Sequence, residues 1–361
     1  MGRIYYIGST SAGSGRSLTA WMVAEALLGQ GLRPGFVKCI PESQDGEEQL
    51  HEDADVVLFR DLLGRERSRP LWPLPAERTP SPGEAPGLTI EGAAARIREW
   101  ADSWGSAVVM GSARIFSDSL SRPISEISLI QRLRAEVFLL DRYEAEADSI
   151  YSLLSLQSLL KGLTRCLILN RVPFGHPVAR LPGIQRLRAG EKHIPPIALI
   201  PEDSMLSSLS VGEIGQALPA RIMSGEETAG RRFCRVSLGA QHLHGSLRVF
   251  RHALGRVLLL APPDPGAPRL DGMEAGSVAG ILLAGPRLPS PALLEAARAA
   301  HISLMHTELE SFAALERLQN ILVSVRSGER YKKERFAELV LRDLGVPDIL
   351  ACNRGESGLD P

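Results

Sequence analysis

The stretch that decides the fold is GSTSAGSGRS at residues 8–17. It follows the apolar run IYYI at 4–7 and precedes LTAWMVAEALLGQG at 18–31, which has the pattern of a helix. A glycine-rich turn between a strand and a helix points backbone N–H groups at an anion, and the helix N-terminus adds a partial positive charge. Residues 8–17 are therefore predicted to form a strand, a loop and a helix around a phosphate.

The end of this loop departs from the usual pattern. Phosphate-binding loops carry a lysine followed by serine or threonine, whereas this chain carries Arg16 and Ser17. Arginine keeps the charge but is a planar fork instead of a compact ammonium, so the exchange is not conservative. Two interpretations stay open: a phosphate site built mainly from Gly8, Gly13 and Gly15, or a glycine-rich turn without a ligand.

Short apolar runs alternate with longer helical segments along the chain. This alternation predicts an α/β fold with a doubly wound parallel sheet over residues 1–225, and the loop at 8–17 would make this a P-loop NTPase-like domain. Within it, the proline-rich segment 65–90 is expected to be a surface excursion without a regular core. A linker is predicted at 223–232, then a smaller α/β domain over 226–350 and a tail at 351–361.

Composition narrows the classes of partner. The net charge of −1 and a pI near 6.7 give no reason to expect binding to nucleic acid or an anionic membrane. No apolar run approaches the roughly 18 residues that span a bilayer, so a cytoplasmic protein is expected. The cysteines at 39, 166, 234 and 352 are far apart, which predicts buried thiols instead of a zinc site or disulfides. His242 and His244 lack a third ligand and are expected to be structural.

Several segments, in order, resemble a known family. IGSTSAGSGRS at 7–17 resembles the opening of the dethiobiotin-synthetase-like domain in the N-terminal regulatory half of bacterial phosphate acetyltransferases. GFVKCI at 35–40, EDADVVLFRDLLG at 52–64, LILNRVP at 167–173 and IALIPEDSMLSSLSVGEIGQAL at 197–218 are similar to later segments of that domain. The C-terminal part resembles the DRTGG domain that follows it, in GAQHLHGSL at 239–247, in residues 278–305 and in ESFAALERL at 310–318.

The resemblance implies ATP or another nucleotide as ligand and assigns roles to residues. Lys38 would face a substrate carboxylate, Asn170 would contact adenine, and Ser17 and Asp53 would hold Mg²⁺. Asp53 also suits a helix start, where the dipole favours an acid without any metal, and the other two could be polar strand ends. The nucleotide-binding residues predicted in this way are Gly8, Gly13, Ser14, Gly15, Arg16, Ser17, Lys38 and Asn170.

Departures from the family argue against catalysis. Met110 stands where the ligases place an acidic magnesium ligand, and a thioether does not replace a carboxylate around a hard cation. Together with Arg16, this removes charge-neutralising groups on which phosphoryl transfer depends. LAPPDPGA at 260–267 and LAGP at 283–286 replace signature residues of the DRTGG family, so a ligand site in that domain is not assumed. We therefore predict no catalytic residues and little dependence on magnesium.

Three functions remain open. A free-standing, non-catalytic nucleotide-binding regulator or sensor, acting on a protein partner or as a homo-oligomer, is the leading hypothesis, because the acetyl-transferring domain is expected to be missing. An ATP-dependent ligase of the dethiobiotin synthetase kind is the first alternative. An interaction scaffold with an empty nucleotide site is the second.

Overall fold

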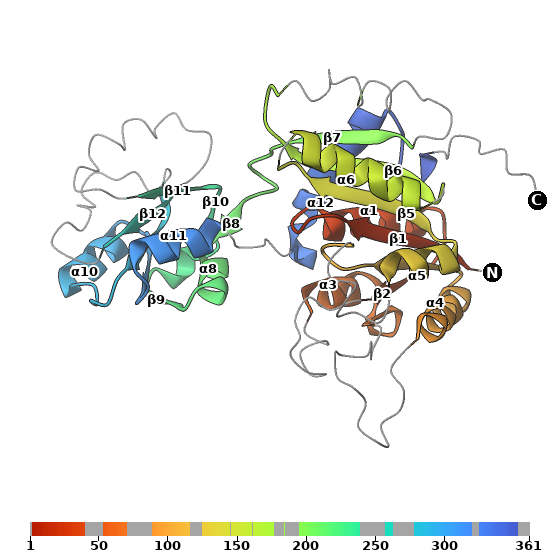
Figure 1. Cartoon of the computed structure of the whole chain (residues 1–361). Helices are drawn as coiled ribbons and strands as arrows, with labels where there is room; N and C mark the ends of the chain where they lie inside the picture. Colours follow the sequence, from red (N-terminus) through yellow and green to blue (C-terminus); the bar gives the residue numbers. More distant parts are fainter. Residues whose placement is uncertain are drawn as a thin grey trace, which may run out of the picture. The chain divides into compact units, whose positions relative to one another are not determined.

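The computed structural model (Figure 1) describes residues 2–39, 53–70, 89–115, 125–144, 146–160, 162–176, 184, 195–238, 257–262, 278–319 and 325–352. The chain divides into two compact units. The first combines residues 1–202 with residues 324–361, and the second comprises residues 203–323. The chain thus leaves the first unit and later returns to it.

The first unit is built on a seven-stranded sheet in the order β3-β2-β4-β1-β5-β6-β7, and every pairing in it is parallel. Its central strands are buried on both faces and consist mostly of aliphatic and aromatic residues, as expected for a covered parallel sheet. The strands are β1 (Arg3–Ser9), β2 (Gly35–Lys38), β3 (Ser68–Pro70), β4 (Ser106–Met110), β5 (Glu136–Arg142), β6 (Thr164–Val172) and β7 (Ile197–Pro201).

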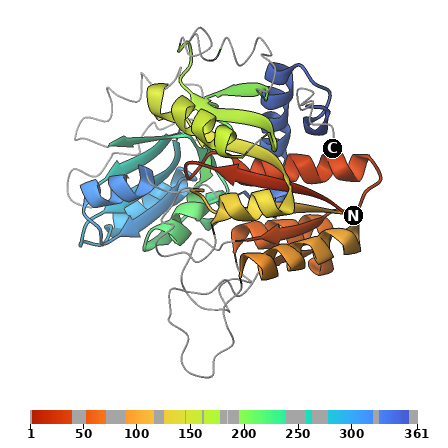
Figure 2. The ribbon, with the colours of Figure 1, turned by 45° about the vertical axis from the view of Figure 1, so that its right-hand side comes forward.

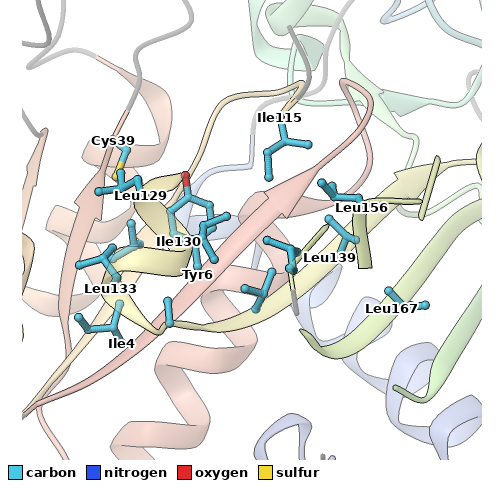
Figure 3. Packing of buried hydrophobic residues seen from close by; sticks show 14 of the residues in the cluster. Ile4, Tyr6, Cys39, Ile115, Leu129, Ile130, Leu133, Leu139, Leu156 and Leu167 are labelled. Atoms are coloured by element: carbon cyan, nitrogen blue, oxygen red, sulfur yellow. The ribbon is translucent and has the colours of Figure 1, made fainter. Parts of the chain in front are cut away.

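Helices cover both faces of this sheet. One core cluster joins β1, β5 and β6 to α4 (Ile90–Trp104), α5 (Glu126–Leu133) and α6 (Glu146–Leu159), and Figure 3 shows part of it around Tyr6 and Leu139. Elsewhere, α1 (Arg16–Gly29) packs on β1 and β4, α3 (Ala54–Leu63) on β2, and α12 (Arg330–Leu344) on β7. Figure 2 shows α1 in red beside the blue α12. The predicted doubly wound parallel sheet is confirmed.

The second unit contains a five-stranded sheet in the order β11-β12-β13-β14-β9, in which only β9 runs antiparallel to its neighbour. A separate pair joins β8 to β10. The predicted smaller α/β domain is confirmed in architecture. Its elements are β8 (Leu209–Ser210), α8 (Val211–Ala217), β9 (Ala220–Ser224), β10 (Arg232–Phe233), β11 (Arg235–Leu238), β12 (Val257–Ala261), β13 (Val278–Ala284), α10 (Pro291–Ala299), β14 (Ser303–Thr307) and α11 (Ser311–Gln319).

The division of the chain differs from the predicted one. The boundary lies at 202/203 instead of 225/226, because β9 pairs with β14 and so belongs to the second sheet. The segment predicted as a linker at 223–232 therefore lies within the second unit, where it includes the short helix η3 (Glu226–Thr228). Residues 324–350 belong to the first unit, because α12 packs on β7 and α1.

Four smaller expectations concern short segments and single residues. The segment 65–90, predicted as an excursion without a regular core, begins with η1 (Arg65–Arg67) and β3, and β3 pairs with β2 in the sheet. This first part is therefore regular structure. Residues 71–88 lie outside the described residues. The described cysteines are free thiols; Cys39, Cys166 and Cys352 are buried and Cys234 is half-buried. The predicted structural histidines at 242 and 244 lie outside the described residues. No helix among the described residues is long and apolar enough to cross a bilayer.

Candidate functional site

The glycine-rich segment forms the predicted strand, loop and helix. β1 ends at Ser9 and α1 begins at Arg16, which leaves residues 10–15 as the loop. Gly13 (φ 70°) and Gly15 (φ 103°) adopt left-handed conformations, which side chains rarely tolerate. Gly8 lies inside β1, paired with Leu139, so it precedes the loop instead of forming part of it.

Two observations point to a ligand at this loop. α1 has no side-chain cap, because its N-cap residue is Gly15, and its first turn contains no acid. By contrast, α3, α4 and α5 are each capped by an Asp, Thr or Ser side chain. The Ser14 hydroxyl is buried and has no hydrogen-bond partner among the residues that the structure describes. A buried hydroxyl without a partner beside an uncapped helix N-terminus fits an anion that would satisfy both.

Neighbouring elements hold the loop from several sides. The Asn170 Nδ2 atom donates to the Ser14 carbonyl over 3.0 Å, and the Asn170 Oδ1 atom accepts from the Arg171 N–H. The Ser11 hydroxyl donates to the Asp141 carboxylate at the end of β5. The predicted adenine contact, Asn170, thus lies at the loop with its amide engaged by backbone groups. Its contact to adenine stays a prediction.

Gly15 also lies against the C-terminal helix. A Cβ atom at this position would lie 3.1 Å from the Asn170 Nδ2 atom and 3.1 Å from the Phe336 ring of α12. Phe336 is fully buried. Sequence reasoning missed this contact, because 321 positions separate the two residues and α12 was assigned to the second domain. The loop therefore depends on glycine for close packing as well as for its backbone angle.

Arg16 is buried and its guanidinium donates to the Gly111 carbonyl over 2.7 Å, just past the end of β4. The next residue, Ser112, donates its N–H to the Glu126 carboxylate, which also accepts from the Tyr6 hydroxyl over 2.8 Å. Burial, followed by the charge of Glu126, raises the pKa of Tyr6 well above its usual value. Glu126 is thus a buried carboxylate next to the strand end where Met110 replaces the family's acid. No sequence motif marks it, since it lies 16 residues beyond Met110 on another element.

A second polar cluster joins Ser17, Lys38, Asp53 and Asp55. The Ser17 hydroxyl donates to Asp55 Oδ1 over 2.5 Å, and the Lys38 ammonium lies 2.5 Å from Asp55 Oδ2 and 3.0 Å from Asp53 Oδ2. Burial opposes ionisation of Asp55, but the charge of Lys38 and hydrogen bonds from Lys38 and Ser17 outweigh it and lower its pKa.

The Ser17 hydroxyl therefore bonds Asp55, and the role of Asp53 as a magnesium ligand stays a prediction. Asp53 caps α3, accepting from the Asp55 and Val56 N–H groups. Both acids stand in the same segment, EDADVVLF, and the residues of a helix's first turn point in different directions, so sequence spacing could not choose between them. Among the described residues, no group of three or more His, Cys, Asp or Glu side chains could hold a metal ion.

Comparisons with known proteins add a family match for the second unit. Residues 213–321 match the family model of the DRTGG domain. This range begins 13 residues before the predicted boundary and stops before α12. The first unit, with its glycine-rich loop after β1 in a parallel sheet, is a P-loop NTPase-like α/β domain.

Solved structures with similarity to this chain include three with bound nucleotides. A nucleotide-binding protein from Archaeoglobus fulgidus with ADP is 16% identical, with 56% of this chain and 83% of that chain covered and a TM-score of 0.32. The signal recognition particle receptor FtsY from Elizabethkingia anophelis with GDP is 10% identical, with 55% and 57% covered and a TM-score of 0.31.

The third comprises the CBS and DRTGG domains of the regulatory region of Clostridium perfringens pyrophosphatase with its activator, diadenosine tetraphosphate. It is 18% identical, with 36% of this chain and 54% of that chain covered and a TM-score of 0.26. This chain spans about half the length of that pyrophosphatase region.

Proposed function

We propose that this chain is a nucleotide-binding regulatory protein that binds phosphate at residues 8–17 and performs no phosphoryl transfer. The observation that carries the proposal is the buried Ser14 hydroxyl without a partner at the uncapped N-terminus of α1. An unsatisfied buried hydroxyl costs about 1–3 kcal/mol, so its retention is explained by a ligand that accepts its hydrogen bond. Phosphate oxygens are such acceptors, and the helix terminus favours their negative charge.

The regulatory part of the proposal rests on the DRTGG match at 213–321 and on the resemblance to the regulatory half of phosphate acetyltransferases. In such an arrangement, the nucleotide acts as a signal that a protein partner or a second copy of the chain responds to. We further propose that the chain acts in the cytoplasm, since neither its charge nor its described helices offer a route to a membrane or nucleic acid.

Two groups next to Gly111 support the part of the proposal that excludes phosphoryl transfer. Phosphoryl transfer is catalysed mainly by positioned cations that neutralise charge on the transferred group. Arg16 is directed at the Gly111 carbonyl, and the buried end of β4 offers the thioether of Met110 where the ligases have a carboxylate. Neither the guanidinium nor the thioether offers an oxygen ligand for the metal ion whose charge the reaction requires.

One observation favours the ATP-dependent ligase as a second candidate. Glu126 brings a buried carboxylate to Gly111 and Ser112, so an acid does exist near the position that Met110 leaves apolar. Both of its oxygens already accept hydrogen bonds, from the Ser112 N–H and the Tyr6 hydroxyl, which favours a role in holding the turn after β4.

The test is equilibrium binding of ATP, ADP and a non-hydrolysable ATP analogue to the purified chain, with magnesium and with a chelator, alongside a phosphate-release assay. The proposal expects binding of all three with release at background. Turnover on the order of 1 per second would overturn the non-catalytic proposal and favour the ligase. Absence of binding in every condition would leave an interaction scaffold and reject the proposal.

A further inference from the structure

The cluster beside the phosphate loop bears on a question that the proposed function leaves open, namely which cation accompanies the nucleotide. Mg²⁺ prefers six oxygen ligands at about 2.0–2.1 Å and is commonly held in nucleotide sites by one or two carboxylates together with phosphate oxygens. The residues that the family resemblance offers for it are Ser17 and Asp53, and the structure adds Asp55 beside them. Their contacts decide whether they suit a metal.

These oxygens are already engaged by protein groups. Asp55 Oδ1 accepts from the Ser17 hydroxyl and Asp55 Oδ2 from the Lys38 ammonium, both over 2.5 Å. Asp53 Oδ1 accepts from backbone N–H groups of α3, and Asp53 Oδ2 lies 3.0 Å from the same ammonium. The Lys38 side chain is 3% exposed. A cation therefore already lies between the two carboxylates, and it is a lysine.

The strand pairing adds to this arrangement. In the register of β2 and β4, Lys38 lies directly beside Met110, whose side chain is fully buried. The neighbour of the lysine is thus apolar at the position where an acid would give a metal a further oxygen. Charge also balances locally: the two carboxylates face the Lys38 ammonium, and the Arg16 guanidinium is close enough to Asp55 to help keep its pKa low. A divalent ion would add two positive charges to a neutral cluster.

We propose that the Lys38 ammonium takes the place of the divalent metal in this site, so that the chain binds nucleotides in their metal-free form. The donor set does not fit Mg²⁺, because both acids and the serine are committed to Lys38, to each other and to backbone groups. The positive charge that a metal would supply next to the phosphates is supplied by a side chain. The part of this inference that concerns nucleotides rests on the proposed function, whereas the part that concerns metal does not.

The metal arm of the test uses Mn²⁺ alone, followed by the electron paramagnetic resonance signal of the free ion. The wild-type chain is expected to bind no Mn²⁺ below the millimolar range. Lys38→Met removes the ammonium and keeps most of the side-chain volume, so it is expected to bind Mn²⁺ at least roughly tenfold more tightly than the wild type. Lys333→Met is the matched control: it removes another buried ammonium, paired with Glu25 on α1, and should bind no more Mn²⁺ than the wild type.

The nucleotide arm measures ADP affinity by calorimetry with Mg²⁺ and with a chelator. The wild-type affinity is expected to agree within about twofold in the two conditions, whereas Lys38→Met is expected to lose at least roughly tenfold in the chelator and to recover with Mg²⁺. A wild-type chain that binds micromolar Mn²⁺, or that gains tenfold or more in ADP affinity from Mg²⁺, overturns the inference, even if Lys38→Met does not fold. If no ADP binds in either condition, the proposed function fails while the Mn²⁺ titration still decides the inference.

Discussion

Replacing Gly15 by alanine tests whether the loop is held as tightly as the structure indicates. A side chain at a left-handed position costs roughly 1–2 kcal/mol. The added Cβ would also lie 3.1 Å from both the Asn170 amide and the Phe336 ring, which must shift by a few tenths of an ångström. Overpacking of a filled core costs about 1–3 kcal/mol. Gly15→Ala is therefore expected to lower the free energy of unfolding of the first unit by about 2–5 kcal/mol in total.

The assay is urea unfolding followed by tryptophan fluorescence, because all four tryptophans, at 21, 72, 100 and 104, belong to the first unit. Gly31→Ala is the matched control: Gly31 has φ 77° but nothing within 4 Å of a Cβ, so it reports the backbone cost alone. The difference between the two variants measures the packing against Asn170 and Phe336. Equal destabilisation by both variants would refute the close contact of the loop with α12.

Further predictions concern single side chains of the site. Arg16→Ala should weaken ADP binding by no more than about 1.5–3 kcal/mol in calorimetry, the value of one charge-assisted hydrogen bond, and a larger loss would show that Arg16 and not the glycine loop carries most of the binding. Arg16→Lys should leave ATP hydrolysis at background in a phosphate-release assay, because Met110 still offers no metal ligand, and robust hydrolysis would contradict the non-catalytic proposal. Phe336→Ala should destabilise the first unit by about 3–5 kcal/mol, measured by tryptophan fluorescence, and a loss below 1 kcal/mol would show that α12 is not part of its core. The lowered pKa of Asp55 stabilises the fold above the unfolded pKa near 3.9, and this contribution is lost as the pH falls through the folded pKa. Asp55→Asn should therefore flatten the loss of unfolding free energy between pH 5 and pH 2 in urea titrations. An unchanged slope would show that the pairing of Asp55 with Lys38 does not stabilise the fold.

The sheet could be predicted from sequence because its strands are strongly marked. The strands β1, β4 and β5 are nearly continuous apolar runs, and the glycines before α1 specify a turn that few other residues allow. The loop and its helix follow from the same local signals. The strands β12 and β13 of the second sheet are marked in the same way, but its edge strand β9 is short and half-buried, and the sequence places most of it in the first domain and its last two residues in the linker predicted at 223–232.

The contacts that complete the site could not be predicted in the same way. Phe336 reaches Gly15 only because the chain returns to the first unit after the DRTGG region, and no local pattern encodes that return. Asp53 is the N-cap residue of α3 and Asp55 lies in its first turn, so the two acids stand two positions apart in one segment, and Glu126 approaches Gly111 from α5 through tertiary packing. The residue types indicate the chemistry of the site, whereas which side chains contact each other depends on the packing of elements that are distant in the sequence.

The most direct test of the phosphate site is Ser14→Ala, measured for both stability and ADP affinity. If the buried Ser14 hydroxyl is kept for a ligand, its removal should stabilise the free chain by about 1 kcal/mol in urea unfolding and weaken ADP binding by about 1 kcal/mol in calorimetry. Ser106→Ala is the control, because its hydroxyl is also buried without a partner but lies at the opposite end of the sheet from the loop: it should stabilise the chain and leave ADP affinity unchanged. An affinity that Ser14→Ala does not alter, or a loss of stability in the free chain, would contradict the assignment of a phosphate to this loop.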